Sequence, residues 1–314
     1  MLYSGQCIAI LGPTCCWKSQ SALALAESLR AEIISCDSMQ VYRGLDIGTA
    51  KPSAEEQQRV KHHLISCLDL QEPFDANRFV QAASACLQDI WKRGCVAILA
   101  GGSGLYARAL IYGFEMLPSD PGLSKKLQEE LKLPDGQQKL LNFLERSVGT
   151  ASIIPEEIYR NPRRLLRACE VLQLTGKPPW VLVKKLEQPR AAFRQFCILP
   201  EFSLLKQRIR LRTEKMLSAG WVEEALQVGQ AGLLATPTAR QALGYRDILE
   251  FVGAGSPGGL GALQELLSKR TIQYARRQLT WFRHQHPGAM QITIQDEEQA
   301  LEQILQQIKR NLAC

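Results

Sequence analysis

Short apolar segments alternate with amphipathic stretches through the first hundred residues. Residues 7–11 and 32–36 are predicted to form short strands. Residues 96–100 are a nearly continuous apolar run, which is typical of a strand buried on both faces of a parallel sheet. Between the last two, residues 77–93 carry apolar side chains at helical spacing on one face. This alternation of strands and helices indicates an α/β core with a parallel sheet.

The pattern changes near Leu117 and stays helical to about Pro189, with no buried-strand pattern. Within this stretch Asn161 and Pro162 have the residue types of an N-cap and a first helical position, so a helix is expected to begin there. An apolar segment at 196–199 then predicts a late strand that returns to the sheet. We therefore expect an α/β core formed by residues 1–117 and 190–314, with an all-helical insertion at 118–189.

A basic helix is predicted beyond the Gly/Ser/Pro-rich residues 253–261. Lysine and arginine recur every seven residues, at 269, 276 and 283 and again at 270 and 277, while apolar positions fall on another face. Such a helix fits a surface that follows phosphates, with Tyr274 and Trp281 as candidates for stacking on bases. The alternative is a docked helix with one solvated side.

Charge and cysteine content narrow the class of protein. Residues 1–117 have a net charge of −1 and residues 118–314 a net charge of +8, which suggests a polyanionic partner for the later part. The ten cysteines include no C-x-x-C pair. No apolar run reaches the ~20 residues of a membrane span. We expect a reduced, cytoplasmic protein without a membrane segment.

The strand at 7–11 leads into residues that almost match a phosphate-binding P-loop. Gly12, Lys18 and Ser19 fit the pattern G-x-x-x-x-G-K-[ST], but Trp17 stands where the second glycine belongs. In this motif backbone N–H groups and the lysine bind a phosphate, and the hydroxyl holds Mg²⁺. An indole at this position is expected to crowd the anion site or to tilt Lys18 away. The alternative is that Trp17 turns outward and phosphate binds almost normally.

Two further polar segments follow predicted strands. Asp37 comes after the strand at 32–36, and the glycine-rich residues 101–104 follow the strand at 96–100 and precede a helix. Because functional groups of α/β folds gather at the carboxyl ends of the strands, the P-loop and the second glycine-rich turn are expected to meet at one edge of the sheet. The pair His62-His63 is better explained by a structural role than by catalysis.

Taken together, these segments resemble the tRNA dimethylallyltransferase family, also called isopentenyl-diphosphate:tRNA isopentenyltransferases. The match covers nearly the whole chain, and its most specific part is the run DSMQVYRGLDIGTAKP at residues 37–52. The other matching segments are residues 12–14, 62–64, 101–106, 161–164, 241–246 and 273–283. Three residues of the P-loop depart from the family pattern, namely Cys15, Cys16 and Trp17, and Ser103 replaces a usual threonine.

The resemblance implies a P-loop NTPase-like core with a helical insertion that grips the tRNA anticodon stem-loop. It also implies transfer of a dimethylallyl group from dimethylallyl diphosphate to N6 of the adenosine 3′-adjacent to the anticodon, in tRNAs that read codons starting with U. Mg²⁺ is the implied cofactor, with Ser19 as its ligand, and the enzyme is expected to act as a monomer. Ser124 lies where the family has a basic residue.

The resemblance further implies the roles of individual residues. Those implied in catalysis are Asp37 as the general base, Ser103 and Arg212. Those implied in binding the diphosphate are Gly12, Pro13, Thr14, Cys15, Cys16, Trp17, Lys18 and Ser19. Those implied in binding tRNA are Asp37, Ser38, Met39, Gln40, Ser103, Ser124, Arg163, Arg164, Leu165, Leu166, Arg167, Gln241, Gly244, Tyr245, Arg246, Arg276 and Arg277.

Two alternatives stay open at the level of sequence. The first is a small-molecule enzyme of the same superfamily, an adenylate isopentenyltransferase or a P-loop kinase, although the basic segments at 161–164 and 273–283 argue against it. The second is a tRNA-binding homologue whose catalysis is impaired by Trp17.

Overall fold

The computed structural model describes residues 5–113, 117–149, 153–182 and 192–313, and these fall into two compact units. Unit 1 comprises residues 1–113 and 187–314, and unit 2 comprises residues 114–186. None of the helices in the described residues combines the length and the apolarity needed to cross a membrane.

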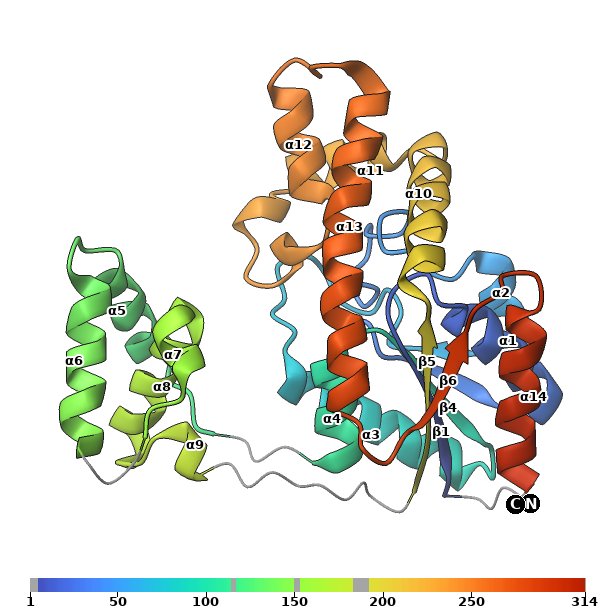
Figure 1. Ribbon diagram of the computed structural model, residues 1–314, viewed down its shortest axis with the longest axis horizontal. Helices are drawn as coiled ribbons and strands as arrows, with labels where there is room; N and C mark the ends of the chain where they lie inside the picture. Colours follow the sequence, from blue (N-terminus) through green and yellow to red (C-terminus); the bar gives the residue numbers. More distant parts are fainter. Residues whose placement is uncertain (1–4, 114–116, 150–152, 183–191, 314) are drawn as a thin grey trace. The chain divides into compact units, whose positions relative to one another are not determined.

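Unit 1 is built around a parallel sheet, as the sequence predicts, and this sheet has six strands (Figure 1). The strand order is β3-β2-β4-β1-β5-β6, so β1, β2 and β4 lie together in the middle of the sheet. Every residue of β1 is buried, because helices cover both faces of the sheet. The strands are β1 Cys7–Leu11, β2 Glu32–Ser35, β3 His62–His63, β4 Ala97–Gly101, β5 Phe193–Pro200 and β6 Met290–Ile294.

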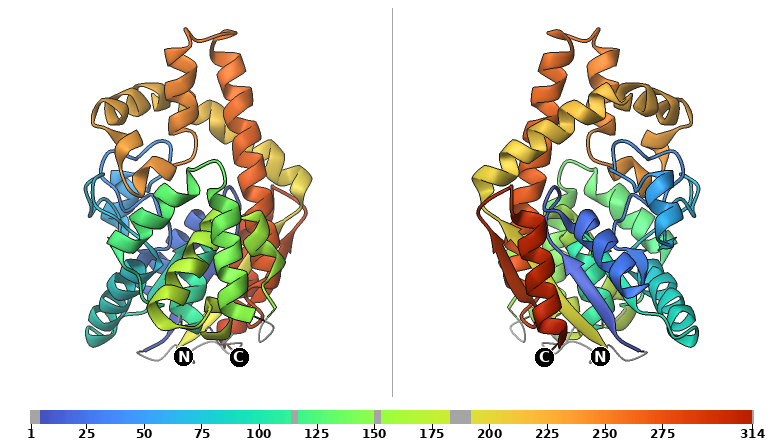
Figure 2. Two further views of the ribbon diagram at one scale, coloured as in Figure 1. Left: turned by 90° about the vertical axis from the view of Figure 1, so that its left-hand side faces the viewer. Right: turned by 90° about the vertical axis from the view of Figure 1, so that its right-hand side faces the viewer.

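Alternate residues of the strands point to opposite faces of the sheet and belong to two separate apolar cores. On one face, Ile8 and Ile10 pack with α1 (Lys18–Leu29) and α14 (Ala300–Ala313), which lie side by side in the right-hand view of Figure 2. On the other face, Cys7, Ala9 and Leu11 pack with further helices. These are α3 (Ala76–Lys92), α4 (Gly104–Tyr112) and α13 (Gly259–His284). The period of two along each strand thus builds both halves of the core.

The other helices of unit 1 surround the carboxyl ends of the strands. Helix α10 packs along α13, which is the longest helix of the described chain. These elements are α2 (Ala54–Arg59), α10 (Phe202–Ser218), α11 (Trp221–Gln230), α12 (Tyr245–Gly253) and the short 3₁₀ turns Leu233–Ala235 and Ala239–Gln241.

Among the described residues of unit 2, helices are the only regular secondary structure. Its helices are α5 (Pro121–Leu131), α6 (Gly136–Val148), α7 (Glu156–Arg160), α8 (Pro162–Thr175) and α9 (Pro179–Leu182). The side chain of Asn161 caps α8 by accepting hydrogen bonds from the backbone N–H groups of Arg163 and Arg164, with Pro162 in the first turn. This is the helix start that the sequence predicts. Leu144 and Leu165 are fully buried in the small core that these helices share.

Candidate active site

The P-loop leaves the sheet at Gly12, a position that only glycine fits. Its φ is 152°, and a Cβ there would lie 2.5 Å from the carbonyl oxygen of Ile198 on the neighbouring strand. Cys15 and Trp17 have φ values of 63° and 62°, in the left-handed region that side chains normally avoid. Helix α1 begins immediately afterwards at Lys18, so its positive end faces the loop.

Lys18 stays over the loop. Its Nζ donates to the carbonyl oxygen of Pro13 and lies 3.6 Å from the Sγ of Cys16. Burial raises the pKa of the Cys16 thiol, although the charge of Lys18 acts against this, so the thiol stays neutral near pH 7. The expectation that Trp17 tilts Lys18 away from the loop is therefore wrong for this structure.

Trp17 is buried, with 7% of its surface exposed, and it packs against the apolar core on the α1 side of the sheet. The guanidinium of Arg208 lies over the indole at 3.8 Å from the ring centroid, a cation–π contact. Arg208 also donates from Nε to the carbonyl oxygen of Cys15 at 2.9 Å and forms an ion pair with Glu297. The alternative that Trp17 turns outward is contradicted.

Two helices that come late in the chain complete the loop's surroundings. From α10, Nη2 of Arg212 donates to Oγ1 of Thr14 at 2.5 Å. From α13, the amide of Gln278 accepts from the backbone N–H of Thr14 at 2.9 Å and donates to the carbonyl oxygen of Gly102 at 2.8 Å. Gln278 thus joins the P-loop to the second glycine-rich turn, and these two turns do meet at one edge of the sheet.

Asp37 follows β2 at the same edge. Its Oδ1 accepts hydrogen bonds from the backbone N–H groups of Met39 at 2.9 Å and Gln40 at 3.3 Å, which fixes the orientation of the carboxylate. The Oγ of Ser103 accepts from the backbone N–H of Ser38 at 3.0 Å. In this structure the Ser103 hydroxyl therefore supports the turn that carries Asp37.

These groups enclose a hollow of about 300 Å³, which we call the active-site hollow. Of the residues predicted for the site, it brings together Thr14, Cys15, Cys16, Trp17, Lys18, Ser19, Asp37, Gln40 and Arg212. Gly12, Pro13, Ser38, Met39 and Ser103 are not among its lining residues. The lining also includes Tyr274, which the sequence suggests for stacking on bases, and residues that were not predicted for the site, among them Thr49, Ala50, His62, Arg208 and Gln278.

The histidine pair divides between two environments. His62 lines the active-site hollow, and burial lowers its pKa. His63 bonds through Nε2 to a carboxylate oxygen of Glu32 at 2.6 Å, as a structural residue would.

No group of three His, Cys, Asp or Glu side chains within the described residues could hold a metal ion by itself. The Ser19 hydroxyl and the Asp37 carboxylate do line the same hollow. One or two such oxygen ligands suit Mg²⁺, which usually takes its remaining ligands from water and substrate phosphates.

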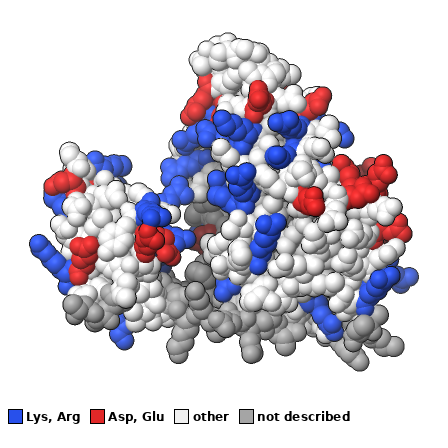
Figure 3. Space-filling view, in the orientation of Figure 1, with Lys and Arg blue, Asp and Glu red and all other residues white. Residues whose placement is uncertain are grey.

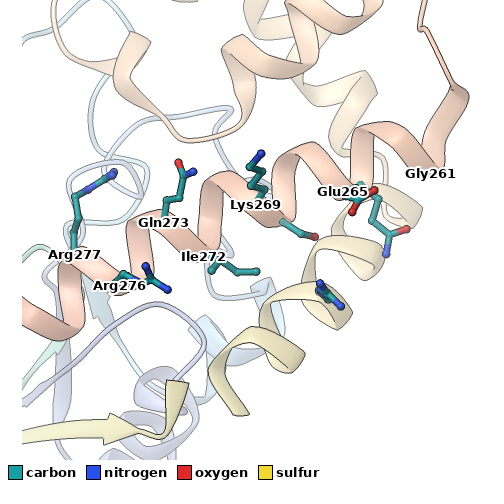
Figure 4. A pocket seen from close by; sticks show the side chains of 10 residues that line it. Gly261, Glu265, Lys269, Ile272, Gln273, Arg276 and Arg277 are labelled. Atoms are coloured by element: carbon teal, nitrogen blue, oxygen red, sulfur yellow. The ribbon is translucent and has the colours of Figure 1, made fainter. Parts of the chain in front are cut away.

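A second hollow of about 740 Å³ lies along α13 and α10, and we call it the α13 hollow. Most of its lining residues come from α13, and Figure 4 shows Ile272 and Arg276 extending on the side of α10. Four cationic side chains line it against one carboxylate, Glu265. Among the described residues, none of the four forms an ion pair; they are Arg210, Lys269, Arg276 and Arg277. Figure 3 shows Lys and Arg side chains gathered along this helix.

The predicted tRNA-binding residues of unit 2 differ in whether their side chains already have partners within the protein. Arg163 is exposed, and Arg164 pairs with Glu157 at 2.9 Å. Arg167 pairs with Glu170 at 2.5 Å and also donates to the carbonyl oxygens of residues 117 and 118. Ser124 donates to Glu170 at 2.6 Å. Burial acts to raise the pKa of Glu170, but the bonds from Ser124 and Arg167 outweigh it and hold that pKa below its usual value.

Two other predicted tRNA-binding side chains lie in the interior. Leu165 is fully buried and Tyr245 is 1% exposed, so neither can contact a nucleic acid directly in this structure. Each is flanked by an exposed arginine, Arg164 beside Leu165 and Arg246 beside Tyr245, and the sequence motif did not separate the buried positions from the exposed ones. Gly244 is buried as well and Leu166 is half-buried, whereas Gln241, Arg246, Arg276 and Arg277 are exposed.

Comparison with known proteins gives a consistent result. The family model described as IPP transferase matches residues 40–285. A tRNA dimethylallyltransferase of Salinispora tropica is 38% identical over 286 residues, which cover 90% of this chain and 86% of that protein. The crystal structure of the tRNA isopentenylpyrophosphate transferase of Bacillus halodurans aligns with a TM-score of 0.69 and 31% identity over 98% of this chain and 97% of that chain. A eukaryotic dimethylallyltransferase acting on tRNA aligns with a TM-score of 0.79 and 25% identity over 96% of this chain and 77% of that chain.

Proposed function

The chain belongs to the IPP transferase family, and from this premise we propose that it transfers a dimethylallyl group from dimethylallyl diphosphate to the exocyclic N6 amine of an adenosine in tRNA. Within the tRNA, we propose that the target is the adenosine 3′-adjacent to the anticodon. The observation that carries the proposal is the active-site hollow, in which the P-loop with Lys18, the α10 residue Arg212 and the oriented carboxylate of Asp37 line the same space.

The reaction needs a group that takes a proton and a set of donors that stabilises the leaving diphosphate. A bond forms between N6 and C1 of the dimethylallyl group, and the bond between C1 and the diphosphate oxygen breaks. The proton of the amine passes to the carboxylate of Asp37 as its general base. Negative charge grows on the diphosphate, where Lys18, Arg212 and the backbone N–H groups of the P-loop stabilise it.

The chain also carries groups suited to the metal and to the RNA. Ser19 would hold Mg²⁺, which when bound supplies further positive charge to the diphosphate. The cations of the α13 hollow, which form no ion pair within the described part of the chain, and the exposed Arg163 suit RNA phosphates, because such contacts release condensed counterions.

The substitution Asp37→Asn tests the proposal. The amide oxygen can still accept the two backbone hydrogen bonds, so the geometry is kept while the proton acceptor is lost. We expect transfer to fall ~10²- to 10⁴-fold, with tRNA affinity within a few fold of the parent. The prenylated nucleoside is measured by mass after incubation with dimethylallyl diphosphate and undermodified tRNA.

The exposed Asp69, changed to Asn, serves as the control and should leave turnover unchanged. Normal turnover by Asp37→Asn would remove Asp37 from the mechanism. Parallel incubation with AMP separates the proposal from an adenylate isopentenyltransferase, which would prenylate AMP instead of tRNA.

A further inference from the structure

One wall of the active-site hollow is formed by a turn outside any helix or strand. Thr49 and Ala50 line the hollow, and the residues before them, 45–48, lead to it from the side of α11. A segment without a backbone hydrogen-bond ladder needs other partners for its N–H groups.

A single carboxylate supplies those partners. On α11, Oε2 of Glu224 accepts from the backbone N–H groups of Asp46 at 3.0 Å and Ile47 at 2.8 Å, and Oε1 accepts from that of Gly48 at 3.0 Å. Three successive N–H groups that converge in this way form an anion-binding nest. Oε1 also accepts a hydrogen bond of 2.6 Å from the hydroxyl of Tyr245. Hydrogen bonds to an ionised acceptor are about twice as strong as neutral ones.

Buried aromatic rings hold the nest in place. A Cβ on Gly48 would lie 2.1 Å from Nε1 of Trp221 and 2.6 Å from the ring of Tyr245, so the turn packs directly on these rings. The two rings meet edge to face at 6.0 Å. Burial, together with the neighbouring Glu224, raises the pKa of Tyr245 far above its usual value, so its hydroxyl remains a donor to the carboxylate.

Gln40 connects this turn to the proposed general base. Its Nε2 donates to the carbonyl oxygens of Thr49 at 3.1 Å and Ala50 at 3.2 Å, while its Oε1 accepts from the Ser35 hydroxyl at 2.9 Å. The backbone N–H of Gln40 donates to Oδ1 of Asp37. A displacement of the turn is thereby passed on through Gln40 to the carboxylate.

We propose that Glu224 is a positioning residue for the reaction, which rests on the function proposed above. It lies outside the lining of the active-site hollow. By fixing the turn at 46–48 it holds Gln40 and Asp37 at the geometry in which the carboxylate takes the proton of the adenosine amine as that amine attacks C1 of the dimethylallyl group. The P-loop is fixed separately by α10 and α13, so the binding of dimethylallyl diphosphate does not depend on Glu224.

The test compares two neighbouring glutamates of α11. Glu224→Ala removes the acceptor of the nest, whereas Glu223→Ala removes an exposed carboxylate one residue earlier. We expect Glu224→Ala to lower kcat on tRNA about 100-fold, because misplacement of a reacting group by ~1 Å has an effect of that size. The KM for dimethylallyl diphosphate should stay within about threefold of the parent, a range well under the tenfold that 1.4 kcal/mol of binding represents. Tyr245→Phe removes one of the four hydrogen bonds to Glu224 and should give a smaller loss of kcat on tRNA.

Hydrogen exchange provides a readout that does not depend on activity. The backbone amides of residues 46–48 should exchange faster in Glu224→Ala than in the parent and in Glu223→Ala, while the amides of α11 keep their protection. Equal kcat for the parent and Glu224→Ala would overturn the inference alone. Faster exchange throughout α11, or an equal loss with Glu223→Ala, would assign Glu224 a general role in stability and also overturn it. Absence of prenylated tRNA from the parent chain would overturn the proposed function and the inference together.

Discussion

Trp17 occupies a backbone position where glycine has the lower conformational cost, yet its indole is part of the core. The left-handed φ of 62° is unfavourable for a non-glycine residue by roughly 1–2 kcal/mol. Three stabilising features oppose this cost. They are the burial of the ring, its contact with Arg208 and the ion pair of Arg208 with Glu297. Truncation of a buried tryptophan typically costs about 3–5 kcal/mol, so the packing is the larger effect.

Replacement of Trp17 by glycine should therefore destabilise the protein. We expect Trp17→Gly to lower the melting temperature and to leave the KM for dimethylallyl diphosphate unchanged or raised. If the indole instead crowded the anion site, the same variant would lower that KM about tenfold, or ~1.4 kcal/mol. The matched control is Arg30→Gly, since Arg30 is exposed and has a φ of 51° at the other end of α1. This variant measures the effect of placing glycine at a left-handed backbone position without the loss of an aromatic ring. A Trp17→Gly protein with a lower KM and full stability would contradict the packing argument.

The P-loop and Asp37 could be recognised from sequence because their residues are contiguous and each follows a strand. Gln278 and Arg208 could not, since each bonds to the loop across more than 190 residues of chain. In the sequence Gln278 is one more polar position on a predicted basic helix. Only the rotation of α13 against the sheet shows that its amide is buried.

At the scale of elements, the junction of α13 with β5 and α4 buries a titratable ring. Nδ1 of His286 lies 3.3 Å from Oε1 of Gln195 in β5, and the ring packs against Phe282 and Tyr112. Burial, with the nearby charge of Arg108, lowers the pKa of His286 to about 4. The neutral ring is therefore the form that the folded protein accepts.

This shift predicts a loss of stability in mild acid. The unfolded chain binds a proton at a pKa of about 6.5, whereas the folded protein does so only near pH 4, so the unfolded state binds more protons between these values. The stabilisation is complete above pH 6.5 and is lost as the pH falls toward 4, up to ~3 kcal/mol. We expect His286→Gln to flatten the pH dependence of the free energy of unfolding in this window, measured by urea denaturation.

The exposed His284 on the same helix is the matched control for this experiment. His284→Gln should keep the pH dependence of the parent. If both variants keep it, His286 does not titrate as the structure indicates.

Elements with a strong local pattern were predictable, and those defined by distant partners were not. Strands β1, β2 and β4 have apolar runs, whereas only two of the five residues of β6 are buried, since it lies at the edge of the sheet. The pattern of apolar residues therefore does not predict β6. The order of the strands could not be predicted from sequence either, because residues of β1 pair with residues of β5 more than 180 positions later in the chain.

At the scale of the whole molecule, the cations in the later part of the chain differ in whether a nearby carboxylate neutralises them. Arg270 pairs with Asp247 and Arg208 with Glu297, so these cations are locally neutralised. The four cations of the α13 hollow have no such partner among the described residues. A polyanion is therefore expected to gain more binding free energy from contact with the α13 hollow than from the overall net charge of the chain.

The salt dependence of tRNA binding separates local contact from overall charge. Each phosphate contact contributes about 0.7–0.9 to the slope of log K against log salt concentration. If Arg210 and Lys269 each contact one phosphate, Arg210→Ala with Lys269→Ala should reduce that slope by about 1.5. The control pair, Arg43→Ala with Arg59→Ala, removes the same charge from residues that are paired with Asp69 and Glu27. Because both double variants lower the net charge equally, an equal change of slope in the two would mean that overall charge governs binding. A change confined to the first variant would place RNA phosphates at the α13 hollow.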